Sequence, residues 1–254
     1  MADLCFESAY DFSGQVAVVT GAYGAIGSTI SQMLAERGAR VIMLDKIDGK
    51  NANLHELQGK GHSSRVIDLT VFESISPLIE DVEREYGKID ILINNAGIAL
   101  IDDALNVSEQ RWDLQMDINL KAPFILAQAV GRGMLERGYG RIVNMASQAG
   151  VIALQGHVGY TATKAGLIGM TKALALEWGQ KGVTVNAVSP TVVNTELGRR
   201  VFAGQLGDDF KAKLPTRRFA EPEEVALAVL YLVSAGAAST NGANLLVDGG
   251  YTIQ

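Results

Sequence analysis

VAVVTGAYGAIG, residues 16–27, places an apolar and largely β-branched run directly before a cluster of three glycines. The run Val16–Thr20 is too short for a helix and stops at the glycines, which predicts a buried strand of a parallel sheet. Residues 28–37 then follow a helical pattern that ends at Gly38. Strand, glycine turn and helix together predict a phosphate cradle, because the turn exposes backbone N–H groups and the helix N-terminus adds partial positive charge. A tight turn that needs positive φ is the alternative explanation of the glycines.

The next apolar run, Arg40–Asp45, ends in a carboxylate eighteen residues after Gly27. A carboxylate at this distance is placed to accept hydrogen bonds from the hydroxyls of an adenosine ribose. It also repels a 2′-phosphate, so the sequence favours NAD over NADP as the cofactor. Lys46 and Lys50 keep NADP open as the alternative, because a nearby cation can accept the phosphate.

Strand patterns and helix patterns alternate along the rest of the chain. Further strands are expected at residues 65–69, 89–93, 142–146, 183–188 and 244–247, and helices at 72–86, 108–137, 158–180 and 222–232. Pro123 requires a kink or a break inside the second of these helices. No linker or repeat interrupts the pattern, so we predict one α/β domain over residues 1–254: a Rossmann-like, doubly wound, parallel sheet of seven strands with helices on both faces. Residues 196–219, rich in glycine and mixed charge, predict a mobile lid, with a solvated loop as the alternative.

Composition restricts the possible partners and the cellular compartment. The chain of 254 residues is 48% hydrophobic, enough for a sizeable core, and its net charge of −6 includes no Lys/Arg block that would attract nucleic acid or an anionic membrane. Cys5 is the only cysteine, which excludes internal disulfides and a cysteine-cluster metal site and fits a reducing compartment. Neither a secretory signal nor an apolar run of membrane-spanning length is present. We therefore expect a cytoplasmic protein without a bound metal.

Residues 141–164, RIVNMASQAGVIALQGHVGYTATK, carry the candidate chemistry. In a helix, Tyr160 and Lys164 share one face about one turn apart, and Ser147 follows an apolar strand at the sheet edge where ligands bind. The pKa of an isolated phenol is about 10, so acid-base work near neutrality requires a fall of about 3, or roughly 4 kcal/mol. A cation about 4 Å away, at an effective dielectric constant of about 20, supplies an interaction of that size. A helix that carries an exposed Tyr and Lys by chance is the alternative.

Taken together, these segments resemble the short-chain dehydrogenase/reductase family along residues 16–252. The resemblance rests on TGAYGAIG at 20–27, the acidic end of the second strand, Asp68, NNAG at 94–97, Asn119, Ser147, the Tyr160-x-x-x-Lys164 pair, VNAVSP at 185–190 and VDGG at 247–250.

The resemblance implies a role for each matching residue. Tyr160 is expected to be the acid-base group, Ser147 to orient the substrate oxygen, Lys164 to lower the Tyr160 pKa and hold the nicotinamide ribose, and Asn119 to support a water in a proton relay. The expected cofactor contacts are Gly21, Tyr23, Gly24 and Ile26 at the diphosphate, Asp45 at the adenosine ribose, Asp68 and Leu69 at the adenine, Asn95 on the adenosine side, and Val193 and Thr195 at the carboxamide.

The chain departs from the family pattern at two positions. Where the family has T-G-x-x-x-G-x-G, position 25 is alanine and a glycine stands at 24, so the path of the phosphate loop is open. After the sixth strand the usual P-G is Pro190-Thr191. Within the family, SPTVVNTELGRRVF at 189–202 and VDGGYTI at 247–253 are similar to dehydrogenases of glycerol, tetritols and other sugar alcohols. By that resemblance Gln148, Gln155 and His157 contact substrate hydroxyls, or they are merely polar loop residues.

The sequence thus favours an enzyme that transfers hydride between NAD and a secondary alcohol, specifically a small polyol, with Tyr160 as acid-base group. A reductase of 3-oxoacyl thioesters or other ketones is the alternative within the family, and Asp45 argues against it because such reductases commonly use NADPH. A non-catalytic NAD-binding protein would not need the complete catalytic set. A serine hydrolase lacks its G-x-S-x-G elbow, and only His55, His62 and His157 are available as its base. The apolar helices 108–137 and 158–180 predict a homodimer or homotetramer, as the family usually forms.

Overall fold

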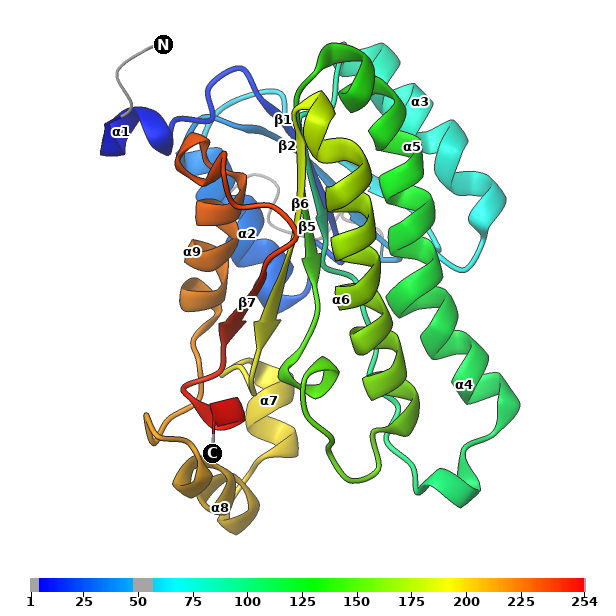
Figure 1. The fold of residues 1–254 in the computed structure, drawn as a ribbon, viewed down its shortest axis with the longest axis vertical. Helices are drawn as coiled ribbons and strands as arrows, with labels where there is room; N and C mark the ends of the chain where they lie inside the picture. The colour runs from blue at the N-terminus through cyan, green and yellow to red at the C-terminus, as the bar shows by residue number, and fades with distance from the viewer. Residues whose placement is uncertain (1–4, 48–56, 254) are drawn as a thin grey trace.

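Seven strands form one parallel sheet in the order β3-β2-β1-β4-β5-β6-β7 in the computed structural model, which describes residues 5–47 and 57–253 (Figure 1). The strands are β1 Val16–Thr20, β2 Arg40–Asp45, β3 Ser63–Val66, β4 Ile91–Asn94, β5 Gly140–Met145, β6 Val183–Pro190 and β7 Asn244–Val247. The chain order reverses between β1 and β4, so ligands are expected beyond the carboxyl ends of these strands. The predicted doubly wound parallel sheet of seven strands is confirmed.

Helices cover both faces of the sheet (Figure 1). One face carries α2 Ala25–Glu36 and α9 Pro222–Val233, and the other carries α3 Ile75–Tyr86, α5 Ala122–Arg137 and α6 Val158–Trp178. Alternate residues of β1 enter different cores: Ala17 and Val19 pack on the α2 side, whereas Val16 and Val18 pack on the α3 side. Both faces of the strand are therefore buried, which explains its unbroken apolar sequence.

Shorter helical segments complete the described chain. They are α1 Phe6–Ala9, α4 Glu109–Met116, a π-helix at Asp117–Lys121, α7 Glu196–Val201 and α8 Gln205–Lys213, with 3-10 turns at Phe72–Ser74, Ala104–Asn106, Gln148–Gly150, Gly179–Lys181, Ala235–Ala237 and Tyr251–Ile253. None of the described helices is long and apolar enough to cross a membrane.

The predicted helix 108–137 is divided at the position where proline requires it. Pro123 lies in the first turn of α5 and has no N–H for the carbonyl of residue 119, so the helix widens to a π turn over Asp117–Lys121 before it continues. The predicted strand 65–69 begins two residues earlier and ends three residues earlier, at Ser63–Val66. Asp68 and Leu69 therefore follow the strand instead of ending it.

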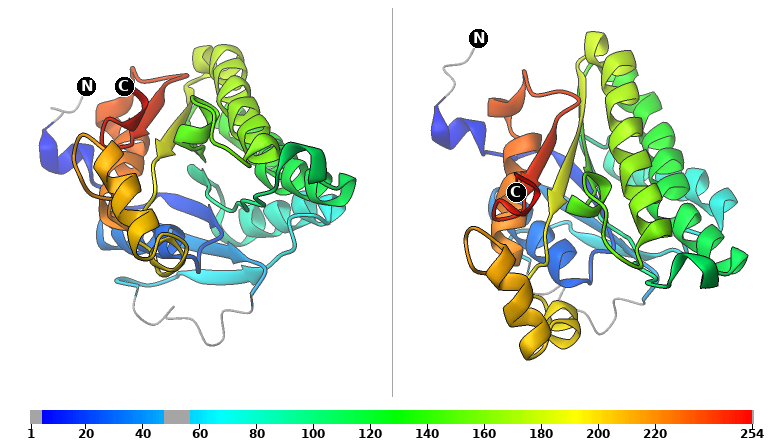
Figure 2. Two further views of the ribbon diagram at one scale, coloured as in Figure 1. Left: turned by 90° about the horizontal axis from the view of Figure 1, so that it is seen from below. Right: turned by 60° about the horizontal axis from the view of Figure 1, so that its bottom comes forward.

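Residues 196–219 contain two helices, so the alternative of an ordinary solvated loop is wrong. Seen from the carboxyl edge of the sheet, α7 and α8 lie on the same side as α2 and α9 (Figure 2). Phe202, Phe210 and Phe219 pack with ring centroids 5.2 to 6.1 Å apart, and the Phe210 ring stacks on Tyr251 at 5.0 Å. This aromatic cluster anchors the segment to the C-terminal region. Its movement as a lid stays a prediction.

Candidate active site

The glycine turn after β1 packs so closely against the start of α2 that it leaves no room for a side chain at Gly27. Gly21 has φ +60°, and a Cβ on Gly27 would lie 2.2 Å from the Gly21 carbonyl oxygen, a separation that no side chain tolerates. Only hydrogen therefore fits where the turn meets α2. The turn and the first residues of α2 form a concave surface at a helix N-terminus, which is an arrangement that binds phosphate.

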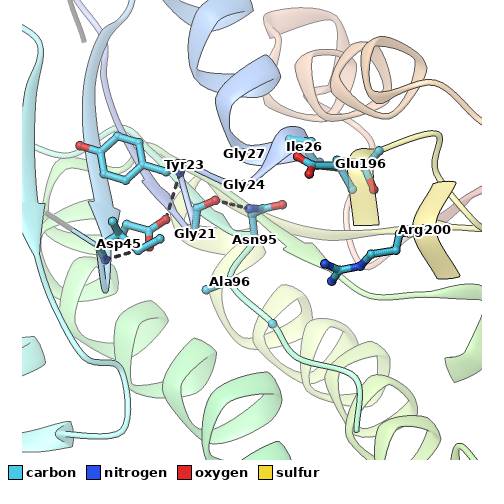
Figure 3. A pocket seen from close by; sticks show the side chains of 14 residues that line it. Gly21, Tyr23, Gly24, Ile26, Gly27, Asp45, Asn95, Ala96, Glu196 and Arg200 are labelled. Carbon is cyan, nitrogen blue, oxygen red and sulfur yellow. Dashed lines mark hydrogen bonds between the residues drawn. The ribbon is translucent and has the colours of Figure 1, made fainter. Parts of the chain in front are cut away.

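A cavity of about 720 Å³ opens over this turn (Figure 3). Its wall includes seven of the predicted cofactor residues: Gly21, Tyr23, Gly24, Ile26, Asp45, Asn95 and Thr195. Gly27, Ala96, Gly97, Glu196 and Arg200 also line it. The tight glycine cradle and a carboxylate at one end fit a dinucleotide with its diphosphate on the turn.

Asp45 is held in place by backbone donors at the end of β2. Its Oδ2 accepts a hydrogen bond from the Tyr23 N–H at 3.0 Å, and its Oδ1 accepts one from the Ile47 N–H at 3.2 Å. The carboxylate is thus tied to the glycine turn and lies on the cavity wall, where the sequence predicted a ribose-binding acid.

Asp68 and Leu69 do not line this cavity. Asp68 forms an ion pair with Lys46 at 2.8 Å and accepts hydrogen bonds from Thr70, and these contacts lower the pKa of Asp68 to about 2. Leu69 packs against the core on the α3 side. Lys46, a candidate for a 2′-phosphate, is thus engaged by Asp68. Lys50 and His55 lie outside the described residues. The adenine contacts stay predictions.

Asn95 connects β4 to the glycine turn. Its Nδ2 donates to the Thr20 carbonyl at 2.9 Å and to the Gly21 carbonyl at 3.1 Å, and its backbone N–H donates to the Thr20 hydroxyl at 3.0 Å. Asn95 therefore positions the turn and lies on the cavity wall as well.

A second cavity, of about 290 Å³, adjoins the first and is lined by Ser147, Tyr160, Lys164 and Val193. The two cavities share Ile26, Asn95 and Gly97 in their walls. The short turn after Ser147 packs tightly on α6, since a Cβ on Gly150 would lie 2.8 Å from the Lys164 backbone. The sequence-predicted catalytic group of Ser, Tyr and Lys is thus assembled in one place, next to the glycine cradle.

Burial shifts the pKa values of the two titratable side chains of this cavity, Tyr160 and Lys164. Burial raises the pKa of Tyr160, and a hydrogen bond with the Ser147 side chain opposes the rise. Burial also lowers the pKa of Lys164, which is 4% exposed, to about 8. The lowering of the Tyr160 pKa by Lys164 stays a prediction. The Lys164 Nζ donates to the Met145 carbonyl at 2.6 Å and lies 5.5 Å from the Tyr160 ring centroid.

Asn119 is completely buried within the π turn. Its Oδ1 accepts from the Ile98 N–H and its Nδ2 donates to the Ile98 carbonyl, both at 2.8 Å, with a further bond to the Thr163 hydroxyl at 3.2 Å. The side chain thereby holds the segment after β4 against α6. Its role in a water relay stays a prediction.

Comparison with known proteins agrees with this geometry. A family model described as enoyl-(acyl carrier protein) reductase matches residues 21–252. NAD-dependent glycerol dehydrogenase of Listeria innocua is 44% identical over 249 residues, covering 98% of this chain and 98% of that protein. D-threitol dehydrogenase of Mycolicibacterium smegmatis is 45% identical over 255 residues, covering 99% of this chain and 98% of that protein. The chain belongs to the short-chain dehydrogenase/reductase family.

A solved structure of the same architecture supports this assignment. The gluconate 5-dehydrogenase from Burkholderia cenocepacia J2315, in complex with NADP and tartrate, superposes with a TM-score of 0.92 at 31% identity, covering 98% of this chain and 99% of that one. The short-chain dehydrogenase/reductase fold therefore extends over nearly the whole sequence.

The two departures from the family motif leave this short-chain dehydrogenase/reductase site intact. Gly24 has φ −70°, so it needs no glycine freedom, and Ala25 simply begins α2. The loop still closes through a bond from the Gly24 N–H to the Gly21 carbonyl at 3.2 Å. Thr191 is 8% exposed, and among the described non-glycine residues only Arg217 has positive φ, so threonine is tolerated at 191 without strain.

The three candidate substrate contacts have different surroundings. Gln148 is 3% exposed, and its buried Oε1 has no hydrogen-bond partner within the described chain. The His157 ring lies 6.2 Å from the Tyr160 ring, and its Nδ1 bonds the Gln155 carbonyl at 2.7 Å. Gln155 itself is exposed. His157 therefore lies beside Tyr160, and Gln148 directly follows Ser147 in the chain, but neither lines the cavity of Ser147, Tyr160 and Lys164. Nothing brings the Gln155 side chain to it.

The wall of the cofactor cavity also includes residues that the sequence analysis did not single out for this role. Glu196 and Arg200 reach it from α7, whose first turn is capped by the Thr195 hydroxyl accepting from the Gly198 N–H at 3.0 Å. Both lie in the segment TELGRR. The spacing of four residues between 196 and 200 indicates that their side chains share one face of a helix. Within residues 5–47 and 57–253, no group of three or more His, Cys, Asp or Glu side chains is arranged to hold a metal ion.

Proposed function

We propose that this protein is an NAD-dependent dehydrogenase that oxidises a secondary alcohol, specifically a small polyol or sugar alcohol, to the corresponding ketone. The observation that carries the proposal is the meeting of Ser147, Tyr160 and Lys164 in one cavity beside the glycine cradle. The similarity to glycerol and threitol dehydrogenases over nearly the full chain supports the choice of substrate class.

The proposed chemistry follows from the side chains of this cavity. NAD, when bound, accepts the hydride that leaves the carbinol carbon. The Tyr160 oxygen removes the hydroxyl proton, and the Ser147 hydroxyl, which already bonds Tyr160, holds the substrate oxygen beside it. The Lys164 ammonium lies over the Tyr160 ring, 5.5 Å from its centroid, and adds positive charge there. Because burial raises the pKa of Tyr160, further positive charge in the cavity is required for the phenolate to form near neutral pH.

The choice of NAD over NADP rests on Asp45. Its carboxylate lies on the cavity wall, and Lys46 is paired with Asp68. A 2′-phosphate next to Asp45 would face a like charge, whereas ribose hydroxyls donate hydrogen bonds to it. The name of the NAD-dependent glycerol dehydrogenase relative supports this choice, whereas the gluconate 5-dehydrogenase structure holds NADP.

Reduction of 3-oxoacyl thioesters is the second candidate function. It is favoured by the similarity to the 3-oxoacyl-[acyl-carrier-protein] reductase of Vibrio cholerae, which is 37% identical over 240 residues. Asp45 opposes it, as in the sequence argument. The two activities share the catalytic group and differ in cofactor and in the size of the substrate.

We also propose a cytoplasmic homodimer or homotetramer. The long helices of the α3 face carry exposed apolar side chains, including Leu176, 82% exposed on α6, and Phe124, 41% exposed on α5. We place the contact between subunits at these side chains.

The deciding experiment measures NADH formation with glycerol, erythritol, the threitols, arabinitol, sorbitol and galactitol, run beside simple secondary alcohols. We expect turnover with at least one polyol and a preference for NAD over NADP. Activity only with oxoacyl thioesters and NADPH would replace the first proposal with the second.

Tyr160→Phe tests the mechanism. The variant keeps the aromatic ring and removes the phenolic oxygen that accepts the proton. We therefore expect turnover to fall at least about 10³-fold, within the range that acid-base groups contribute. Affinity for NADH, measured by fluorescence titration, should stay within about twofold. Unchanged turnover would exclude Tyr160 as the acid-base group.

A further inference from the structure

Arg200 presents a guanidinium to the cofactor cavity from α7. Figure 3 shows the side chain directed from α7 toward Asn95 and Ala96, at the opposite end of the cavity from Asp45. Arg200 forms no hydrogen bond or ion pair within the described part of the chain, although Glu196 lies on the same cavity wall. A cation that faces a cavity without a protein partner is available to an anionic ligand.

The preceding arginine has a different environment. Arg199 turns away from the cavity, and its Nη1 donates to the Asn194 carbonyl at 3.0 Å and to the Asn194 side-chain oxygen at 3.3 Å. The two arginines are therefore neighbours of identical chemistry, one engaged by the protein and one facing the cavity. They form a matched pair for experiment.

The base of α7 is held close to the end of β6, which fixes the direction of the helix. A Cβ on Gly198 would lie 2.2 Å from the Val193 carbonyl oxygen, and Val193 pairs with Ala220 in an isolated β-bridge. Thr195 caps the first turn. Arg200 thus reaches the cavity from a tightly packed helix base and not from a free loop.

The distribution of charge in the cavity identifies the ligand group. Asp45 occupies the ribose end and the glycine turn occupies the middle, so the diphosphate of a dinucleotide lies between Asp45 and Arg200. We infer that Arg200 binds this diphosphate and thereby fastens α7 over the cofactor. The inference rests on the proposed use of NAD. The glycine turn provides neutral N–H donors. Arg200 adds a charged, bidentate hydrogen-bond donor, which favours phosphate over neutral ligands.

Binding measurements test this role without reference to turnover. We would determine the dissociation constants of NADH, ADP-ribose and adenosine for the wild type, Arg200→Gln and Arg199→Gln by calorimetry, with competition for the weak ligand adenosine. Arg200→Gln should weaken NADH and ADP-ribose about tenfold or more, as expected for a lost charge-assisted hydrogen bond. Adenosine affinity should be unchanged, Arg199→Gln should behave as wild type, and Arg200→Lys should recover part of the loss.

Three results would overturn the inference. These are equal affinity of Arg200→Gln and wild type for ADP-ribose, an equal loss for adenosine, and an equal loss in Arg199→Gln, because the last two indicate a general effect on α7. If Arg200→Gln keeps its NADH affinity but loses turnover of the polyol substrate, the guanidinium serves the substrate instead and the inference is also wrong.

Different results would refute the proposed substrate class and the proposed role of Arg200. A wild-type protein that binds ADP-ribose through Arg200 yet oxidises no polyol refutes the proposed substrate class and leaves Arg200 in its role. A protein that oxidises polyols while Arg200→Gln binds normally refutes only the role of Arg200.

Discussion

Lys164 is the buried cation of the cavity that Ser147 and Tyr160 also line, and its burial has a thermodynamic cost. Removal from water lowers its pKa from 10.5 to about 8, which corresponds to about 3 kcal/mol of differential interaction. Its one direct hydrogen bond in the described chain goes to a backbone carbonyl, that of Met145. The protein thus keeps an ammonium in a position where an apolar side chain would be easier to bury, as expected of a group retained for function.

We therefore expect the stability of the cofactor-free protein to depend on pH through Lys164. Between about pH 8 and 10.5 the unfolded state holds more protons at this residue than the folded state does, so stability rises with pH. Relative to Lys164→Met, the wild-type free energy of unfolding should increase by up to about 3 kcal/mol across that window. Urea titrations of both proteins at matched pH measure it. A constant difference would show that the amine keeps its ordinary pKa.

A second single residue, Asp45, is expected to set the preference for NAD over NADP through its negative charge. Asp45→Ala should reduce the preference for NAD over NADP at least about tenfold, because a like-charge contact worth about 1–4 kcal/mol is removed. The ratio of kcat/KM with the two cofactors measures this change. Asp81→Ala, on the exposed face of α3 and paired with Arg84, is the control. An unchanged preference would exclude Asp45 as the discriminating residue.

At the scale of elements, the junction of the glycine turn and α2 is decided by close contacts. A methyl on Gly27 would meet the Gly21 carbonyl at 2.2 Å and the Asn95 amide at 2.7 Å, whereas a methyl on Gly24 would meet only the Gly21 carbonyl, at an acceptable 3.4 Å. The sequence does not distinguish the two glycines, but only Gly27 has no room for a side chain.

Gly27→Ala should consequently destabilise the protein by about 1–3 kcal/mol, the usual cost of forced overpacking, and weaken NADH binding at least about tenfold. Gly24→Ala should keep the wild-type melting temperature. Thermal unfolding and fluorescence titration of the two variants provide the comparison. Equal stability of both variants would contradict the contact argument.

At the scale of the whole molecule, helices on both faces of the sheet leave apolar side chains exposed. Phe124 on α5 and Leu176 on α6 lie on one face, and Leu227 on α9 lies on the other, with Leu176 the most exposed of the three. We expect light scattering to give two or four times the chain mass of 27.0 kDa. Leu176→Glu should shift the mass toward one chain, and Leu206→Glu, at an exposed leucine of α8, should not. A wild-type mass near 27.0 kDa would contradict the oligomer.

The sequence by itself determined the order and type of the main elements. β1, β2 and β7 have the predicted limits, because a short apolar run between turn residues is a property of neighbours in the chain. The catalytic spacing was equally local, since four residues make one turn of α6 and Ser147 follows its strand directly. Sheet topology then places these carboxyl ends at one edge.

Only the tertiary structure decided how distant side chains meet. The sequence does not tell that Lys46 pairs with Asp68, that the Lys164 amine bonds the Met145 carbonyl, or that Arg200 and not Arg199 enters the cavity. Each depends on the spacing of segments brought together by packing, and the pKa of Tyr160 depends on burial that no local pattern records. Local periodicity determines elements, whereas contact, desolvation and orientation arise when those elements pack.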